Sequence, residues 1–276
     1  MNLRMPRYLR SLGLLAAALV LGASDAGAAC PAAGGERATV ASIGERGEIV
    51  LADGRAVRLA GIDIPDAGRG EAENAANARS WLASRLVGHE IGLRLLGART
   101  DRWGRWIADV SLAAEGAPPL ISLGLLSAGL ARVRPEVEAH GCLAERLAAE
   151  DAARNDGLGL WTDPYYGVVE ATDLDDLRQR DGQFAIVEGV VLRVGTGRDR
   201  TWLDFGRRGG FSAVVMARQA KAFERGGVLL SDLVGARVRV RGAMDNRFGL
   251  RMAISEPDEI EQLAEPAGGR GTKPDE

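Results

Sequence analysis

Short strand candidates separated by glycine-containing turns fill most of this 276-residue chain, and a polar segment divides them into two groups. That segment, DPYYGVVEATDLDDLRQRDGQ, covers residues 163–183 and divides the chain near residues 165–183. A chain of this length accommodates one large or two small domains, and apolar residues make up 46% of it, which is enough for real cores. The sequence therefore predicts two units, residues 29–164 and 184–262, joined by a linker at residues 165–183.

The first group combines strands with helices. Short strands are predicted at residues 39–43, 48–51, 56–62, 90–96 and 106–112. Helices are predicted at residues 71–86, at about 121–128 and at about 143–156. The last helix is expected to bury Leu143 and Leu147, to expose Glu145 and Glu150, and to end at the glycines of DGLG.

The second group has a different order of elements. Three strands, a helix and two further strands are predicted at residues 184–194, 200–206, 211–216, 218–225, 237–244 and 250–254. This order, within about 75 residues, fits a small five-stranded barrel of the OB type. Residues 263–276 have the composition of a disordered tail.

Residues 1–28 have the features of a secretory signal. Arg4, Arg7 and Arg10 precede an apolar run at residues 12–21, and AGA at residues 26–28 fits a small-residue cleavage site. The run is short for a bilayer span, although an uncleaved membrane anchor is the alternative. No later segment approaches transmembrane length, so the mature protein is expected to be exported, periplasmic or secreted, without a stable membrane span.

The chain contains two cysteines, Cys30 and Cys142. An even count in an exported protein favours a disulfide, which here would close a loop of more than 100 residues. The alternative for Cys30 is lipid attachment, because GAAC places small residues before it, and the protein would then be lipid-anchored.

Charge is distributed in blocks along the chain. Residues 29–177 hold 15 basic and 23 acidic side chains, whereas residues 178–251 hold 15 basic and 7 acidic ones. The second unit is therefore strongly basic and the first is acidic.

The segment VRLAGIDIPD, residues 57–66, is apolar but carries Arg58 near its start and Asp63 and Asp66 at its end. With the helix that follows it, and with TDRWGRWIADV, LLSAGLARV and GLGLW, it resembles the staphylococcal nuclease (thermonuclease) family. The four motifs occur in the family's order and spacing across residues 38–164. The resemblance implies a mainly β fold with helices (α+β), in which a nuclease-type OB barrel with appended helices precedes the second OB-like barrel.

The resemblance also implies a chemistry. These enzymes hydrolyse phosphodiester bonds of DNA and RNA with one calcium ion, which two aspartates and a backbone carbonyl hold. Two arginines bind the scissile phosphate, and a glutamate activates or positions the attacking water. Arg58 and Arg105 match the arginines, Asp63 matches one metal-binding aspartate, and Ile64 would supply the carbonyl. Arginines and a hard cation suit the negative charge of a pentacovalent phosphorane.

Two positions depart from the family pattern. Gly47 stands where the second metal-binding aspartate belongs, and Asp66 replaces the general-base glutamate with a side chain one methylene shorter. Glu45 or Glu48 could supply the missing carboxylate. Fewer carboxylates weaken calcium binding, and a displaced base slows the reaction.

Structural roles compete with these functional ones. Asp63 precedes a proline and also suits a turn, and Asp66 also suits a helix cap. Arg58 could form a structural ion pair with Asp63, and Arg105 could be a solvated strand end. Trp103 is interpreted as a packing residue rather than a base-stacking platform.

The basic second unit contains a row of arginines. Arg237, Arg239 and Arg241 alternate along one predicted strand and so share a face, and Trp202 lies on another strand. Arginines beside an aromatic ring suit the binding of single-stranded DNA or RNA. The alternatives are that the arginines solvate an exposed face, or that this basic unit pairs with the acidic first unit.

Two functions follow from these observations. The first is an exported, calcium-dependent nuclease, a hydrolase whose basic OB module binds the substrate. The second is a catalytically degenerate nuclease-fold module that binds nucleic acid or an envelope protein.

Overall fold

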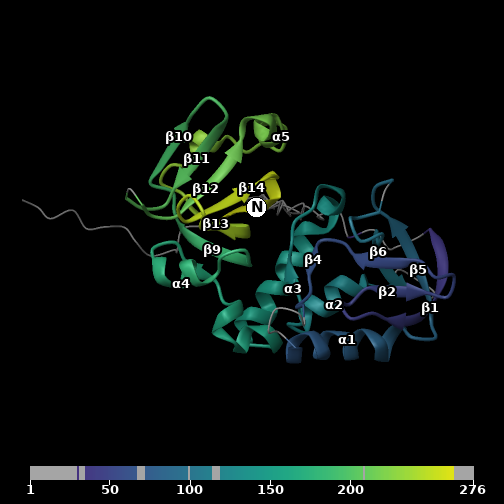
Figure 1. Cartoon of the computed structure of the whole chain (residues 1–276). Coiled ribbons are helices and arrows are strands. Elements are labelled where there is room, and N and C mark those ends of the chain that lie inside the picture. Colours follow the sequence, from purple (N-terminus) through teal and green to yellow (C-terminus); the bar gives the residue numbers. More distant parts are fainter. Residues whose placement is uncertain are drawn as a thin grey trace, which may run out of the picture.

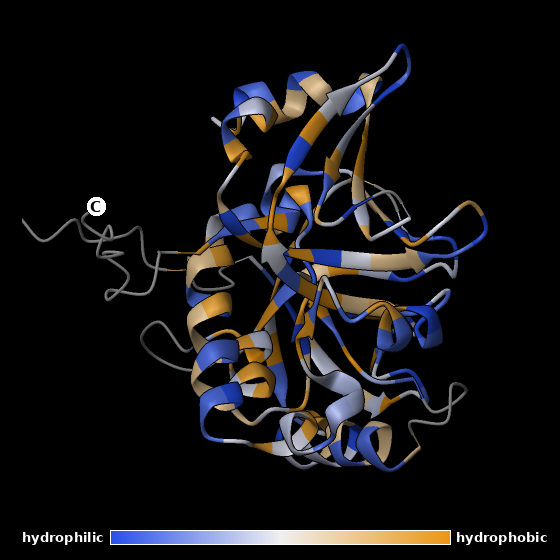
Figure 2. Cartoon of the chain, turned by 90° about the vertical axis from the view of Figure 1, so that its left-hand side faces the viewer, coloured by the Kyte–Doolittle hydropathy of each residue, from blue (hydrophilic) through white to orange (hydrophobic). Residues whose placement is uncertain are grey.

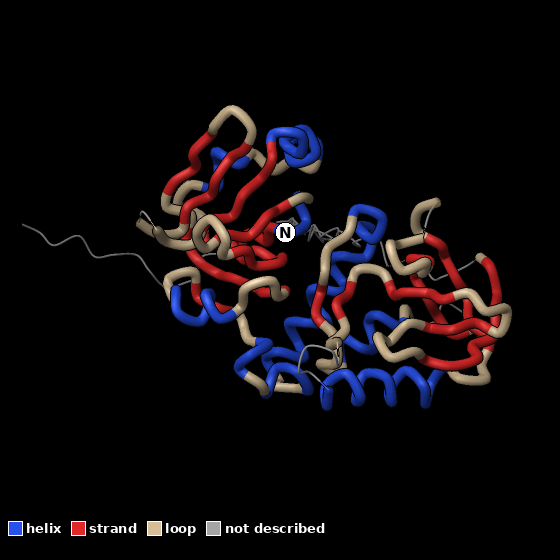
Figure 3. The backbone as a smooth tube through the Cα atoms, viewed as in Figure 1, coloured by secondary structure: helices blue, strands red, loops and turns tan. Residues whose placement is uncertain are grey.

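The computed structural model describes residue 30 and residues 35–66, 72–98, 100–113, 119–207 and 209–263. The predicted signal sequence and all but the first residue of the predicted tail lie outside these residues. The described part contains two groups of strands, each with its own hydrophobic core, and helices lie between them (Figures 1 and 3). Hydrophobic and hydrophilic residues are mixed along the strands of both groups (Figure 2).

The first sheet is a closed five-stranded barrel in the order β1–β2–β3–β6–β5. Its strands are β1 (Glu36–Ile43), β2 (Ile49–Leu51), β3 (Ala56–Leu59), β5 (Glu90–Leu95) and β6 (Trp106–Leu112). The first half of β1 pairs with β5 and its second half pairs with β2, while β3 and β6 run parallel. The predicted OB-type barrel of the first unit is therefore confirmed.

A turn at Gly61 redirects the chain out of this barrel. The strand predicted at residues 56–62 ends early because Gly61 has φ of +72°, a conformation that favours glycine. A side chain there would also lie 2.7 Å from the guanidinium of Arg146. After the turn, β4 (Ile62–Asp63) pairs with β7 (Arg132–Val133) rather than with a barrel strand. This places Asp63 outside the barrel wall.

Three helices accompany the barrel: α1 (Ala72–Leu86), α2 (Ile121–Ser127) and α3 (Leu143–Asn155). The prediction that Glu150 faces solvent was wrong, because Glu150 and Arg146 are both buried on α3. The reason is that α3 lies between the barrel and the second sheet, so that both of its sides are covered (Figure 1). Among the helices that the structure describes, none combines the length and hydrophobicity that a bilayer span requires.

The second sheet has eight strands. They follow the order β10–β11–β12–β14–β13–β9–β8, and β15 (Ile260–Gln262) is added on β13. The six long members are β9 (Phe184–Val190), β10 (Arg193–Thr196), β11 (Arg200–Asp204), β12 (Ser212–Met216), β13 (Arg237–Asp245) and β14 (Arg251–Ile254). Helix α5 (Ala220–Arg225) lies between β12 and β13 in the sequence, where a helix was predicted.

A closed second barrel is not confirmed by these pairings. The strand predicted at residues 184–194 is two strands, β9 and β10, which pair with different partners. The order of pairings is nevertheless that of the first barrel, where the two halves of β1 also pair with different partners, and β12 and β14 are parallel like β3 and β6. Strands β9 and β10, which correspond to the two halves of β1, are joined by the two residues Val191 and Leu192.

The segment predicted as a linker is folded. It contains β8 (Val169–Glu170) and α4 (Leu174–Gln179), and three of its apolar side chains, Val169, Ala171 and Leu177, are buried in the core of the second sheet. The polar residues around them suggested a linker, but three buried side chains are enough to attach the segment to the sheet.

The two cysteines form a disulfide between Cys30 and Cys142, which are 112 residues apart. The backbone amide of Cys30 also donates a hydrogen bond to Glu145 on α3, at 3.1 Å. This is the pair that the sequence predicts, and it leaves no thiol at Cys30 for a lipid.

Candidate functional site

A cleft of about 820 Å³ lies where the barrel and the second sheet meet. The barrel side supplies Arg58, Asp63, Ile64, Asp66 and Arg105, which are residues that the sequence singled out. The opposite wall comes from the second sheet and the segment before it, and it includes Tyr165, Gln183, Phe184, Gly242 and Ala243. The cleft therefore brings together positions that are far apart in the sequence.

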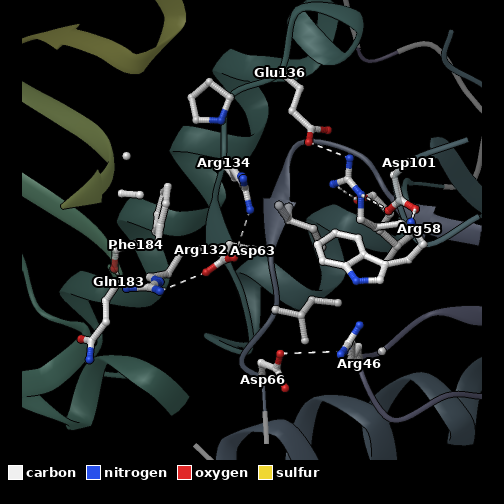
Figure 4. A pocket seen from close by; sticks show the side chains of 18 of the residues that line it. Arg46, Arg58, Asp63, Asp66, Asp101, Arg132, Arg134, Glu136, Gln183 and Phe184 are labelled. Atoms are coloured by element: carbon white, nitrogen blue, oxygen red, sulfur yellow. Dashed lines mark hydrogen bonds and ion pairs between the residues drawn. The ribbon is translucent and has the colours of Figure 1, made fainter. Parts of the chain in front are cut away.

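Arg58 enters the cleft from β3 and is held by two carboxylates. Its Nη2 donates to Glu136 at 2.7 Å, and its Nε lies 3.9 Å from Asp101 (Figure 4). The pairing of Arg58 with Asp63, which the sequence left open, is replaced by these two contacts. A half-buried guanidinium between two carboxylates is fixed in position and remains charged.

Asp101 orders the loop that carries Arg105. Its carboxylate accepts hydrogen bonds from the guanidinium of Arg105 at 2.8 and 2.9 Å and from the backbone amides of Trp103 and Arg105. Partial burial acts to raise the pKa of Asp101, but these hydrogen bonds hold that pKa below its usual value. Arg105 is thereby a well-positioned cation rather than a solvated strand end.

Trp103 is an exposed aromatic residue at this cleft. Its side chain is 51% exposed, and the guanidiniums of Arg102, Arg105 and Arg46 lie 3.9, 4.9 and 5.6 Å from its ring centre. The interpretation of Trp103 as a packing residue does not fit this environment. An exposed indole surrounded by guanidiniums offers a stacking surface beside positive charge.

Asp63 lies between two arginines: Arg132, which is on β7, and Arg134, which directly follows that strand. Its Oδ2 is 3.0 Å from Nη2 of Arg132, and its Oδ1 is 3.8 Å from Nη1 of Arg134 (Figure 4). Arg132 is nearly buried, donates to the carbonyl of Phe184 at 3.2 Å, and has the rings of Tyr166 and Phe184 at 5.1 and 4.9 Å. The carboxylate implied to bind calcium is thus engaged by cations of the protein itself.

The other positions implied to hold calcium do not complete a metal site. Gly47 has φ of +72° and provides no carboxylate, and the side chain of Ile64 lies against it. Asp66 faces Arg46 at 3.9 Å. Glu45 and Glu48 are absent from the cleft lining, and Glu48 accepts a hydrogen bond from the backbone amide of Arg46. Within the described residues no group of three or more His, Cys, Asp or Glu side chains is placed to hold a metal, and the residues present do not fit a calcium centre.

The family model described as staphylococcal nuclease homologue matches residues 56–163, a segment that contains Arg58, Asp63, Asp66 and Arg105. Over residues 56–163 the chain is similar to the staphylococcal nuclease family. No curated protein matches the chain significantly. The nuclease domain recognised in this way begins after β1 and β2, which complete its barrel, and it ends before the second wall of the cleft.

The arginine row of the second sheet does not face the cleft as a binding surface. Arg237 pairs with Glu170 and Glu188, and Arg239 pairs with Glu188. Arg241 is buried and pairs with Glu150 on α3 of the nuclease domain at 2.6 Å. The sequence placed these arginines on one face, but that face packs against acidic residues, so their predicted role in binding nucleic acid does not fit the structure.

Trp202 lies elsewhere on the second sheet. On β11 it pairs with Gly195 of β10, and its ring lies 2.7 Å from where a side chain on Gly197 would begin. It is not among the residues that line the cleft. Trp202 therefore serves as packing for two glycines.

Sequence reasoning missed three residues of the nuclease domain that shape the cleft: Arg132, Arg134 and Glu136. The motif LLSAGLARV, which resembles the family, overlaps the segment ARVRPE, in which two arginines alternate with an apolar residue. Alternating charged residues on a short strand that follows a helix place two guanidiniums on one face, which would have indicated a second cluster of positive charge.

Proposed function

We propose that this nuclease-fold protein binds the phosphate backbone of single-stranded DNA or RNA in the cleft. The observation that carries the proposal is the number of guanidiniums on one surface. Six arginines line the cleft, namely Arg46, Arg58, Arg102, Arg105, Arg132 and Arg134. Guanidinium groups bind phosphate oxygens in pairs through parallel hydrogen bonds, and the exposed ring of Trp103 adds a surface on which a base can stack.

The proposal moves the binding surface from the second sheet to the nuclease domain. The second sheet contributes the opposite wall through Gln183 and Phe184. Of its arginine row, Arg239 and Arg241 reach Asp151 and Glu150 of α3, and Arg237 pairs with Glu170 and Glu188 within the second sheet. The similarity of residues 56–163 to the staphylococcal nuclease family supports nucleic acid as the ligand.

Export remains part of the proposal. The disulfide between Cys30 and Cys142 supports it, because structural disulfides persist in oxidising compartments such as the periplasm or the extracellular medium.

Hydrolysis of the phosphodiester bond is the second candidate function. It is favoured by one specific observation: Arg58, Arg105 and Asp66 line the same cleft, although the last two are separated by 39 positions. In that reaction Arg58 and Arg105 would bind the phosphate and stabilise its added negative charge, and Asp66 would position a water molecule. Family members use calcium for this step, but the residues described above do not assemble its ligands, so we assign no step to a metal here.

Binding and cleavage are separated by one pair of measurements. Fluorescence anisotropy with a labelled single-stranded oligonucleotide should show affinity that falls steeply with salt concentration. Arg58→Ala and Arg105→Ala should each weaken binding by roughly tenfold. Arg178→Ala is the matched control, because Arg178 is 55% exposed, pairs with Asp175 and lies outside the cleft lining. Equal loss in all three variants would contradict the proposal.

Cleavage is followed on a gel with the same oligonucleotide in calcium and in chelator. Binding without turnover in either condition is the expected result. Rapid cleavage in calcium that stops with chelator and is lost in Arg58→Ala would establish the second candidate function instead.

A further inference from the structure

Asp63 has a different partner from the one that its family position implies. Its two carboxylate oxygens face Arg132 at 3.0 Å and Arg134 at 3.8 Å (Figure 4). A calcium ligand must direct its oxygens at the ion, and a nearby guanidinium competes for the same lone pairs and repels the cation.

The pairing with Arg132 is built into the fold. Asp63 and Arg132 are direct partners in the β4–β7 ladder. The side chain of Arg132 is only 6% exposed, and three further contacts hold it: the carbonyl of Phe184 and the rings of Tyr166 and Phe184. Turning away from Asp63 would leave a nearly buried guanidinium without its carboxylate, which is costly.

Arg134 differs from Arg132 in its freedom. Its side chain is 55% exposed, it lines the cleft, and it reaches Asp63 only at 3.8 Å, which is beyond hydrogen-bonding distance. Its backbone amide is fixed by the carbonyl of Gly61 at 3.0 Å, so the side chain has a firm base. Of the two guanidiniums that face Asp63, the one of Arg134 can therefore turn toward an incoming anion at the smaller cost in free energy.

We infer that the cleft binds phosphodiesters without a metal ion, with Arg132 as the permanent countercharge of Asp63 and Arg134 as an anion-binding residue that Asp63 restrains. This inference rests on the proposed function for its ligand. It assigns Asp63 a role opposite to that of a calcium ligand: the carboxylate lowers the affinity for phosphate instead of supporting it.

Calcium alone tests the metal part of the inference. Isothermal titration of calcium chloride into the full chain should give no saturable binding, and Asp63→Asn should give the same result. Saturable binding that Asp63→Asn removes would overturn the inference, whether or not the protein binds an oligonucleotide.

The labelled single-stranded oligonucleotide tests the anion part, with chelator present throughout. Wild type should bind with the same affinity in chelator and in calcium. Asp63→Asn should bind several-fold more tightly, because the anion-binding Arg134 loses the carboxylate that competes for it. Arg134→Ala should bind roughly tenfold more weakly and reduce the salt slope by about one, while Arg178→Ala should match wild type.

The outcomes distinguish this inference from the proposed function. Weaker binding by Asp63→Asn, or loss of binding in chelator, would overturn the inference while the proposed function stands. Absence of oligonucleotide binding by wild type in both conditions would overturn the proposed function and the role of Arg134. Thermal unfolding identifies any variant that fails to fold, and Arg134→Ala, at an exposed position, carries the test if Asp63→Asn is unstable.

Discussion

Arg241 of β13 and Glu150 of α3 form an ion pair at 2.6 Å, and both side chains are almost completely buried. Glu150 also accepts a hydrogen bond from the backbone amide of Val133 at 2.7 Å. One carboxylate thereby joins the second sheet, the last helix of the nuclease domain and the strand that carries Arg132. The acidic and basic halves of the chain meet at this point.

Glu150→Ala should destabilise the protein by about 3 kcal/mol, because it leaves the buried Arg241 guanidinium with Glu261, at 3.2 Å, as its remaining carboxylate partner among the described residues. The double variant Glu150→Leu with Arg241→Met should lose much less, since it removes both charges and fills the space with apolar groups. Urea unfolding of both variants measures the difference. A double variant less stable than Glu150→Ala would show that the ion pair itself contributes net stability.

Glu188→Gln should destabilise the protein at pH 7 but not in acid. Burial acts to raise the pKa of Glu188, but hydrogen bonds from Arg237 and Arg239 hold that pKa below its usual value of 4.5. A depressed folded-state pKa contributes stability above the unfolded value, and that stability is lost as the pH falls through the folded value. We expect a loss of about 1–2 kcal/mol at pH 7, which shrinks as the pH falls below 4.5. Thermal unfolding over this range measures it, with the exposed Glu224→Gln as a control that should show no such change.

Cys142→Ser should lower the free energy of unfolding by about 2–5 kcal/mol. The bond spans 112 residues, so its removal restores much conformational freedom to the unfolded chain. Reduction of wild type with dithiothreitol should lower the melting temperature to that of the variant. A variant that melts like oxidised wild type would mean that the bond constrains the unfolded chain very little.

Gly47→Asp should not create a calcium site. The residue would have to adopt φ of +72° at a cost of roughly 1 kcal/mol, and its Cβ would lie 3.2 Å from the side chain of Ile64. Asp63 would also stay engaged with Arg132. Calcium titration of this variant should therefore resemble that of wild type, with a slightly lower melting temperature. Strong calcium binding, or cleavage that calcium activates, would show that the missing aspartate was the sole defect.

The barrel could be predicted from the sequence because the motifs that indicate it are continuous stretches of the chain. The motif at residues 57–66 and the helix after it are continuous stretches, and Arg58, Asp63 and Arg105 lie where the motifs predict, on one cleft. What the motifs did not specify is the set of partners. Arg58 meets Glu136, 78 positions away, and Asp63 meets Arg132, 69 positions away. Such pairs depend on how β4 leaves the barrel after Gly61.

The arginine row shows a second limit. Alternation correctly placed Arg237, Arg239 and Arg241 on one face, because strand periodicity is a property of the strand alone. Whether that face meets solvent or protein depends on which acidic residues of the neighbouring strands and of α3 lie opposite it. The opposite net charges of the two halves were the one sequence signal for packing of this face against protein. From the sequence, pairing of the basic unit with the acidic unit therefore stayed an alternative to nucleic-acid binding. Glu150 was assigned to solvent for the same reason.

Strand β13 carries Arg241, which holds the two halves together, directly before Gly242 and Ala243, which line the cleft. Occupancy of the cleft and docking of the two sheets are consequently linked, and linkage is reciprocal. A ligand that touches both walls favours the docked arrangement. A change that loosens the contact between Arg241 and Glu150 weakens ligand binding to the extent that it populates the undocked arrangement. Affinity in this protein can therefore be tuned from a buried position that no ligand reaches.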